Sequence, residues 1–183
     1  MTKKLIGGVL GLGFLIVLCT FVYLMTNNKI SFGYNDGYAP TQPIAFSHQL
    51  HAGKLGIDCT YCHSSVGVSR HASVPALNVC MNCHLIVRQT AGATEPSKEI
   101  AKIIEAYESG KNVEWKKVHL LPDHVKFNHA AHINAGKDCT TCHGQVETMD
   151  IVEQYSSLSM GWCVNCHRQS GNNASINCGT CHY

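Results

Sequence analysis

Five copies of one short pattern, Cys-x-x-Cys-His, constrain this chain more than any other feature of its sequence. They occupy residues 59–63, 80–84, 139–143, 163–167 and 178–182. The chain has 11 Cys and 12 His among 183 residues. At that composition chance predicts roughly 0.04 such patterns, so the five copies must share one chemical purpose.

The spacing within the pattern suits one cofactor. Two thiols separated by two residues can form thioethers with both vinyl groups of a porphyrin, and the adjacent His then ligates its iron. Zinc knuckles and disulfide scaffolds also use Cys-x-x-Cys pairs, but neither needs a His after every second Cys. We therefore predict five covalently bound haem c groups. The predicted thioether residues are Cys59, Cys62, Cys80, Cys83, Cys139, Cys142, Cys163, Cys166, Cys178 and Cys181, and the predicted proximal ligands are His63, His84, His143, His167 and His182.

Each iron needs a sixth ligand if the chain carries electrons rather than binding a substrate. A Phe-x-His-x-x-His pattern occurs twice, at residues 46–51 and 127–132. Residues three apart on a helix point the same way, so one such segment could reach two neighbouring irons. The predicted distal ligands are His48, His51, His129 and His132, followed by His71 and His119, with His124 outside the ligand set. Met149 and Met160 are the thioether alternatives, placed behind the histidines because a buried Met usually serves packing.

An uncharged run at residues 5–25 is long enough to span a bilayer. A cleaved secretory signal is the alternative, but no small-x-small site follows Val22, so we expect a retained single-pass helix. Lys3 and Lys4 precede the run, which places them in the cytoplasm and the rest of the chain on the extracytoplasmic side of a bacterial inner membrane. The eleventh cysteine, Cys19, lies inside this run as a plain thiol.

The soluble part of the sequence is duplicated. We predict an anchor at residues 1–25, a linker at 26–45 and a haem domain at 46–183, with repeats at 46–95 and 127–168 and a fifth haem at 178–183. Between the repeats, Ser97 and Gly110 are positioned to begin and end one amphipathic helix. Elsewhere the periodicity is poor, so the expected fold is mainly α with much irregular structure.

The combination of Phe-x-His-x-x-His with a following Cys-x-x-Cys-His resembles the class III multihaem cytochromes of the c3 and c7 type. Several longer segments are similar to the pentahaem cytochrome subunit of Alternative Complex III. These are residues 38–45 (YAPTQPIA), 46–53 (FSHQLHAG), 118–136 (VHLLPDHVKFNHAAHINAG) and 159–168 (SMGWCVNCHR). That family also has one N-terminal membrane helix.

The resemblance implies an electron-relay subunit of a membrane quinol-oxidising complex, passing electrons to a soluble carrier or a terminal oxidase. The implied partners are an iron-sulfur subunit related to molybdopterin enzymes, quinol-binding membrane subunits and a monohaem cytochrome c. No catalytic centre is expected in this chain. The alternative is a membrane-anchored multihaem quinol dehydrogenase that feeds a periplasmic reductase. Nothing in the composition, with its formal charge of +2, indicates nucleic-acid binding.

Overall fold

The structure, a computed structural model, describes residues 2–26, 35–90 and 92–183. Within these residues the regular elements are all helices, joined by long irregular segments. The prediction of a mainly α chain with much irregular structure is thereby confirmed. The chain divides into two compact units, Met1–Asn35 and Asp36–Tyr183. Residues 27–34, which belong to the predicted linker, lie outside the described residues.

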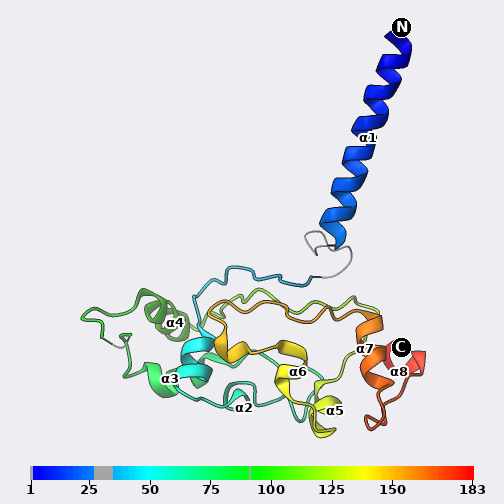
Figure 1. Ribbon diagram of the computed structural model, residues 1–183. Helices are drawn as coiled ribbons and strands as arrows, with labels where there is room; N and C mark the ends of the chain where they lie inside the picture. The colour runs from blue at the N-terminus through cyan, green and yellow to red at the C-terminus, as the bar shows by residue number, and fades with distance from the viewer. Residues whose placement is uncertain (1, 27–34, 91) are drawn as a thin grey trace. The chain divides into compact units, whose positions relative to one another are not determined.

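The first unit contains a single long helix, α1 (Thr2–Thr26) (Figure 1). Its segment Ile6–Thr26 has a mean hydropathy of 2.4. A helix that is apolar on every side and long enough to cross a bilayer matches what a membrane span requires. The residues predicted to span the membrane thus form one continuous helix of suitable length and composition.

The second unit consists of short helices. In chain order they are η1 (Gln49–Lys54), α2 (Cys59–Cys62), α3 (Leu77–His84), α4 (Lys98–Ser109), α5 (His129–Asn134), α6 (Cys139–His143), η2 (Val146–Thr148), α7 (Met160–His167) and α8 (Cys178–Cys181). Of these, η1 is a π-helix and η2 a 3-10 helix. Every Cys-x-x-Cys-His pattern begins in or lies within a helix, so helical geometry fixes the spacing of its thiols.

The helix predicted between the repeats is α4. The Ser97 hydroxyl accepts a hydrogen bond from the Ile100 N–H at 3.5 Å, and Gly110 ends the helix in the left-handed conformation with φ 67°. Ile103 on its inner face packs with Ile44 and Met81. The prediction of this helix and of its two ends is therefore confirmed.

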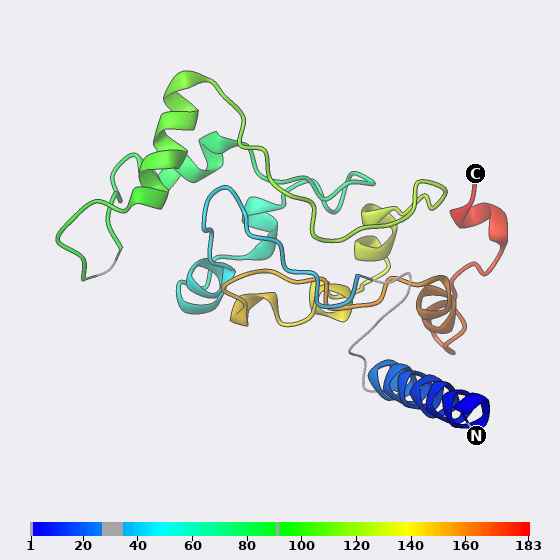
Figure 2. The same cartoon turned by 90° about the horizontal axis from the view of Figure 1, so that it is seen from above.

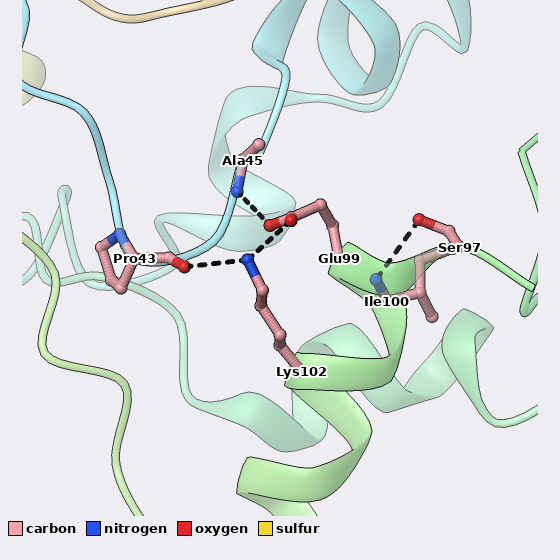
Figure 3. A network of polar contacts seen from close by, with 6 residues as sticks. All are labelled: Pro43, Ala45, Ser97, Glu99, Ile100 and Lys102. Carbon is pink, nitrogen blue, oxygen red and sulfur yellow. Dashed lines mark hydrogen bonds and ion pairs between the residues drawn. The ribbon is translucent and has the colours of Figure 1, made fainter.

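Polar contacts attach α4 to the chain that leads into the haem domain (Figure 3). A Glu99 carboxylate oxygen accepts a hydrogen bond from the Ala45 N–H at 2.8 Å, and the other oxygen pairs with Lys102 at 2.6 Å. Lys102 also donates to the Pro43 carbonyl at 3.5 Å. These contacts fix the start of the first Phe-x-His-x-x-His segment relative to α4.

Gln154 anchors a second irregular stretch. Its side chain is 1% exposed, and its Oε1 accepts a hydrogen bond from the Leu120 N–H at 3.1 Å. Its backbone N–H donates to the Tyr38 carbonyl at 3.0 Å. A buried amide satisfied on both sides holds its neighbours in place, and here one neighbour is the segment that carries His119.

Candidate haem-binding sites

The cysteines of each pattern are brought together by a helical turn. Residues i and i+3 of a helix lie on the same side, so both thiols of a pattern point the same way. Side chains cap three of the helices that carry a pattern: Asp58 accepts from the Thr60 N–H at 2.7 Å, Ser159 from the Trp162 N–H at 3.2 Å, and Asn177 from the Gly179 N–H at 2.9 Å. All cysteines in the described residues are free thiols. This arrangement suits attachment of one porphyrin to each pattern.

The histidines that follow the cysteines are oriented by backbone carbonyls. In four of the five patterns Nδ1 lies within hydrogen-bonding distance of a carbonyl oxygen: His63 with Ser73 at 2.8 Å, His84 with Val87 at 2.8 Å, His167 with Ser175 at 2.7 Å and His182 with His124 at 3.0 Å. An Nδ1–H that donates to a carbonyl fixes the tautomer and leaves Nε2 as the metal-binding nitrogen. In each of the four rings Nε2 is thereby left available to bind a metal.

His143 is the exception among the five. Its Nδ1 lies 3.1 Å from Nε2 of His119, and the two ring centres are 4.3 Å apart. Burial, followed by the neighbouring His119, lowers the pKa of His143 to about 4. Burial likewise lowers the pKa of His119. Both rings are thus held neutral, which is the form that binds a metal.

The two Phe-x-His-x-x-His segments have the same local geometry. Phe46 stacks on His51 at 4.3 Å and meets His48 edge-on at 4.9 Å. The matching distances for Phe127 are 4.5 Å to His132 and 4.8 Å to His129. One phenylalanine therefore holds two imidazoles at roughly right angles to each other, so that the two rings face different sites.

The two segments also have the same hydrogen bonds at the start of their helices. Ser47 accepts a hydrogen bond from the Leu50 N–H at 3.1 Å, and Asn128 accepts one from the Ala131 N–H at 3.3 Å. Nδ1 of His51 lies 2.9 Å from the Ser47 carbonyl, and Nδ1 of His132 lies 2.8 Å from the Asn128 carbonyl. Their Nε2 atoms are left free to bind metal.

Three outer histidines have ring centres close to those of pattern histidines. With metal–nitrogen bonds of about 2 Å and roughly 1 Å from nitrogen to ring centre, two axial imidazoles have centres about 6 Å apart. The observed separations are 6.2 Å for His51 and His84, 6.0 Å for His132 and His167, and 5.6 Å for His124 and His182. His129 also lies 6.4 Å from His143.

His48 lies beside His63. Burial, and after it the charge of His63, lowers the pKa of His48 to about 4. Its Nδ1 is buried without a hydrogen-bond partner in the described part of the chain. A buried imidazole nitrogen that is not hydrogen-bonded is costly unless another group satisfies it. A metal would meet that need only if it bound at Nδ1, and not at the Nε2 that is left free in the other rings.

The apolar core of the haem domain is small. Within the described residues the buried apolar side chains are Ile44, Met81 and Ile103. A unit of this length normally buries far more of its surface, so porphyrin rings between the facing histidines would supply the missing apolar volume. The described residues contain no group of three or more His, Cys, Asp or Glu side chains arranged to hold a metal ion directly.

Comparison with known proteins agrees with this geometry. Residues 125–183 match the family of cytochrome c7 and related cytochromes c. Over 165 residues the chain is 30% identical to the "menaquinone reductase, multiheme cytochrome c subunit" of Nitratidesulfovibrio vulgaris (Hildenborough), covering 77% of this chain and 76% of that protein. The chain belongs to the multihaem cytochromes c.

Membership in this family implies covalently bound haem c, and the paired thiols and facing imidazoles of this cytochrome fit that group. When bound, haem supplies one-electron redox chemistry at its iron. The polypeptide would contribute the thiols, the axial rings and the carbonyls that orient them. A multihaem cytochrome c serves electron transfer, as the sequence predicted.

The remaining predicted ligands of the cytochrome are placed less favourably. Met160 is 69% exposed at the first turn of α7. The Met149 carbonyl accepts a hydrogen bond from the Gln49 N–H at 2.9 Å, which gives this residue a place in the contact between η1 and η2. His71 lies near His129 rather than against a pattern histidine in the described residues. The ring of His124, which the sequence analysis left outside the ligand set, stacks at 5.6 Å on His182.

Sequence spacing gave no direct sign of the contact between His124 and His182, which are 58 positions apart. An indirect sign was present. The fifth pattern follows the second repeat without a Phe-x-His-x-x-His segment of its own. It therefore needed a distal histidine from elsewhere, and His124 was an unassigned histidine close to the second repeat.

Proposed function

We propose that this cytochrome binds five haem c groups and relays electrons between a membrane quinone-linked complex and a further carrier or oxidase. The observation that carries the proposal is the set of facing histidine pairs about 6 Å apart beside Cys-x-x-Cys-His patterns. Two strong axial ligands on each iron leave no open position for a substrate, which favours electron transfer over catalysis within this chain.

We assign the axial pairs from the ring positions. His84 pairs with His51, and His167 pairs with His132. For His182 the nearest outer histidine is His124, 5.6 Å away between ring centres. Because the His124 carbonyl contacts Nδ1 of His182, its ring would have to move to reach an iron bound at Nε2. His143 pairs with His129, whose ring is nearly parallel to it at 10° and 6.4 Å away. The ring centres of His119 and His143, 4.3 Å apart, are too close for an iron between them. His48 is assigned to His63 because of their electrostatic contact.

The assignment leaves His71, His119, Met149 and Met160 without an iron. His119 would instead hold the ring of His143 through its Nε2, in the role that a backbone carbonyl has at the other four sites. The two methionines would serve packing and surface roles.

The proposed partners follow from the anchor and from the resemblance. Helix α1 would place the haem domain on the extracytoplasmic side of the inner membrane, because Lys3 and Lys4 precede it. Gly7 and Gly11 are spaced for close contact with another membrane helix. An assembly like Alternative Complex III would supply an iron-sulfur subunit related to molybdopterin enzymes, quinol-binding membrane subunits and a monohaem cytochrome c.

A second candidate function differs in the direction of electron flow. The similar protein from Nitratidesulfovibrio vulgaris is a subunit of a menaquinone reductase. A related complex around this chain would deliver electrons to quinone instead of removing them from quinol. The same five sites would serve either direction, because the redox potentials of the partners determine the flow.

Purification of the full chain in mild detergent tests the function. We expect quinol-binding membrane subunits to co-purify and the haems of the purified assembly to become reduced when quinol is added. Reduction only by an extracytoplasmic donor, with electrons then passing to quinone, would support the second candidate. Full haem reduction by quinol in the isolated chain without other subunits would instead support the self-contained quinol dehydrogenase.

A further inference from the structure

We infer that the haem sites form one row in the order of patterns 80–84, 59–63, 139–143, 163–167 and 178–182. The second and fifth patterns of the sequence then hold the two terminal sites, and the first pattern is internal. This inference rests on the proposed function, since it requires a haem at each pattern. Four junctions between neighbouring patterns carry it.

The first junction joins patterns 80–84 and 59–63. Asn82 and Tyr61 each lie between the two cysteines of their own pattern, and the Asn82 amide donates a hydrogen bond to the Tyr61 hydroxyl at 3.0 Å. The thiols are also close, because Cys80, after the effect of burial, has its pKa raised by the nearby Cys62. These two patterns therefore lie against each other.

The second junction joins pattern 59–63 to pattern 139–143 in the other repeat. The Asn134 amide donates a hydrogen bond to the Gly67 carbonyl at 3.2 Å, and the nearby Cys139, after burial, raises the pKa of the Cys59 thiol. The start of α5 is bound to the first repeat, since the N–H groups of His129 and Ala130 donate to the carbonyls of Arg70 and Ser69 at 3.2 and 3.1 Å. Of the two patterns in the first repeat, pattern 59–63 is therefore the one whose flanking segment is bound to the second repeat, in addition to the contact of η1 with η2.

The third junction joins patterns 139–143 and 163–167. The Lys137 ammonium donates to the Asn172 side-chain oxygen at 2.6 Å, and the Asn172 amide donates to the Cys166 carbonyl at 2.5 Å. Cys142 has its pKa raised, after burial, by the nearby Cys166 and Cys163. The segments flanking these two patterns are therefore connected directly.

The fourth junction joins patterns 163–167 and 178–182 through Ser175. Its carbonyl orients His167 at 2.7 Å, and its hydroxyl is hydrogen-bonded to Thr180 at 2.9 Å. The nearby Cys181 adds to the burial that raises the pKa of Cys163. In the described part of the chain, no hydrogen bond or ring contact joins pattern 80–84 directly to any of the last three patterns.

The arrangement of the helices agrees with these contacts. Figure 1 shows α3, α2, α6, α7 and α8 following one another across the haem domain. The same order is visible in the perpendicular view of Figure 2, from the green-cyan helices to the red C-terminal one. The outer histidines agree as well: η1 and the residue before it provide rings for the first two sites in the row, and α5 provides rings for the next two.

A matched pair of haem deletions tests the order. In a Cys19→Ser background, a photoreductant is attached to Tyr183→Cys, beside the proposed terminal haem; Tyr183 is 74% exposed. Cys80→Ala with Cys83→Ala removes the other terminal site, so all four remaining haems should be reduced in the fast phase. Cys59→Ala with Cys62→Ala removes an internal site, so three of the remaining four should be reduced quickly and the haem of pattern 80–84 slowly.

If the haems instead lay in the order of their patterns in the sequence, the deletion of pattern 80–84 would leave one slow haem and the deletion of pattern 59–63 would leave none. That outcome would overturn the inference. A third variant, Cys139→Ala with Cys142→Ala, should leave only two haems in the fast phase. Intact mass must show four haems in each variant and five in the parent; fewer in the parent would contradict the proposed function rather than the order. If the deletions prevent folding, the iron positions in an experimental map of the unaltered full chain test the order. The iron bound at pattern 80–84 should have the iron of pattern 59–63 as its nearest neighbour, and any other nearest neighbour would refute the row.

Discussion

Replacing Phe127 with Leu tests whether the phenylalanine of each Phe-x-His-x-x-His segment keeps two distal ligands in place. Leu retains apolar bulk but loses the ring contacts of Phe127 with His132 at 4.5 Å and His129 at 4.8 Å. Such ring pairs contribute about 0.5–1.5 kcal/mol each. The two together give about 1–3 kcal/mol of orientation that the variant lacks.

That free energy converts to a larger population of detached distal ligand. At 1.4 kcal/mol per factor of ten, the dissociated fraction should rise roughly 5- to 140-fold, shared between the two sites. The assay is carbon monoxide binding to the reduced full-length cytochrome, because carbon monoxide requires an open sixth position. We expect little binding in the parent and clear binding at up to two haems in the variant.

The control is Phe14→Leu, which makes the same replacement in α1, where the ring is 69% exposed and distant in sequence from any histidine. It should leave carbon monoxide binding at the parent level. If Phe127→Leu retains all haems and binds no more carbon monoxide than Phe14→Leu, the ring contacts do not support the ligands and the reasoning fails.

Three further predictions follow from other contacts. His124→Met should raise the reduction potential of one haem without loss of that haem, since Met ligation raises haem potentials and the thioethers of Cys178 and Cys181 remain; an unchanged redox titration would remove His124 from the ligand set. Gly53→Ala should lower the free energy of unfolding by about 1–3 kcal/mol, because the added Cβ would collide with the Glu147 carbonyl. The control Gly67→Ala has open space around it and should cost far less. Equal melting temperatures of the two variants would contradict the close contact of η1 with η2. Removing residues 1–25 and supplying a cleavable signal should give a soluble holo-cytochrome that no longer co-purifies with its complex, and retention of tight binding would show that α1 is only a tether.

The features predictable from the sequence were those written in local spacing. Ser97 and Gly110 marked the ends of α4 correctly because capping chemistry acts within one helical turn. The repeated Phe-x-His-x-x-His pattern likewise indicated two segments of equal geometry, and Phe46 and Phe127 contact their histidines in the same way.

The features that could not be predicted depend on contacts between distant residues. His124 meets His182 across 58 positions, and no local spacing encodes that pairing. The junction of Cys59 with Cys139 places the first pattern between the second and the third, although chain order suggests otherwise. The two repeats also differ in that η1 is a π-helix and α5 an α-helix, although both begin within a Phe-x-His-x-x-His pattern.

Intact mass of the purified full chain after alkylation under denaturing conditions tests the central claim most directly. The chain has 11 cysteines, and ten of them should be held in thioethers. The account predicts the polypeptide mass plus five haems and a single alkyl group, located on Cys19. A mass with four or fewer haems on mature protein, or with additional alkylated thiols within the Cys-x-x-Cys-His patterns, would contradict it.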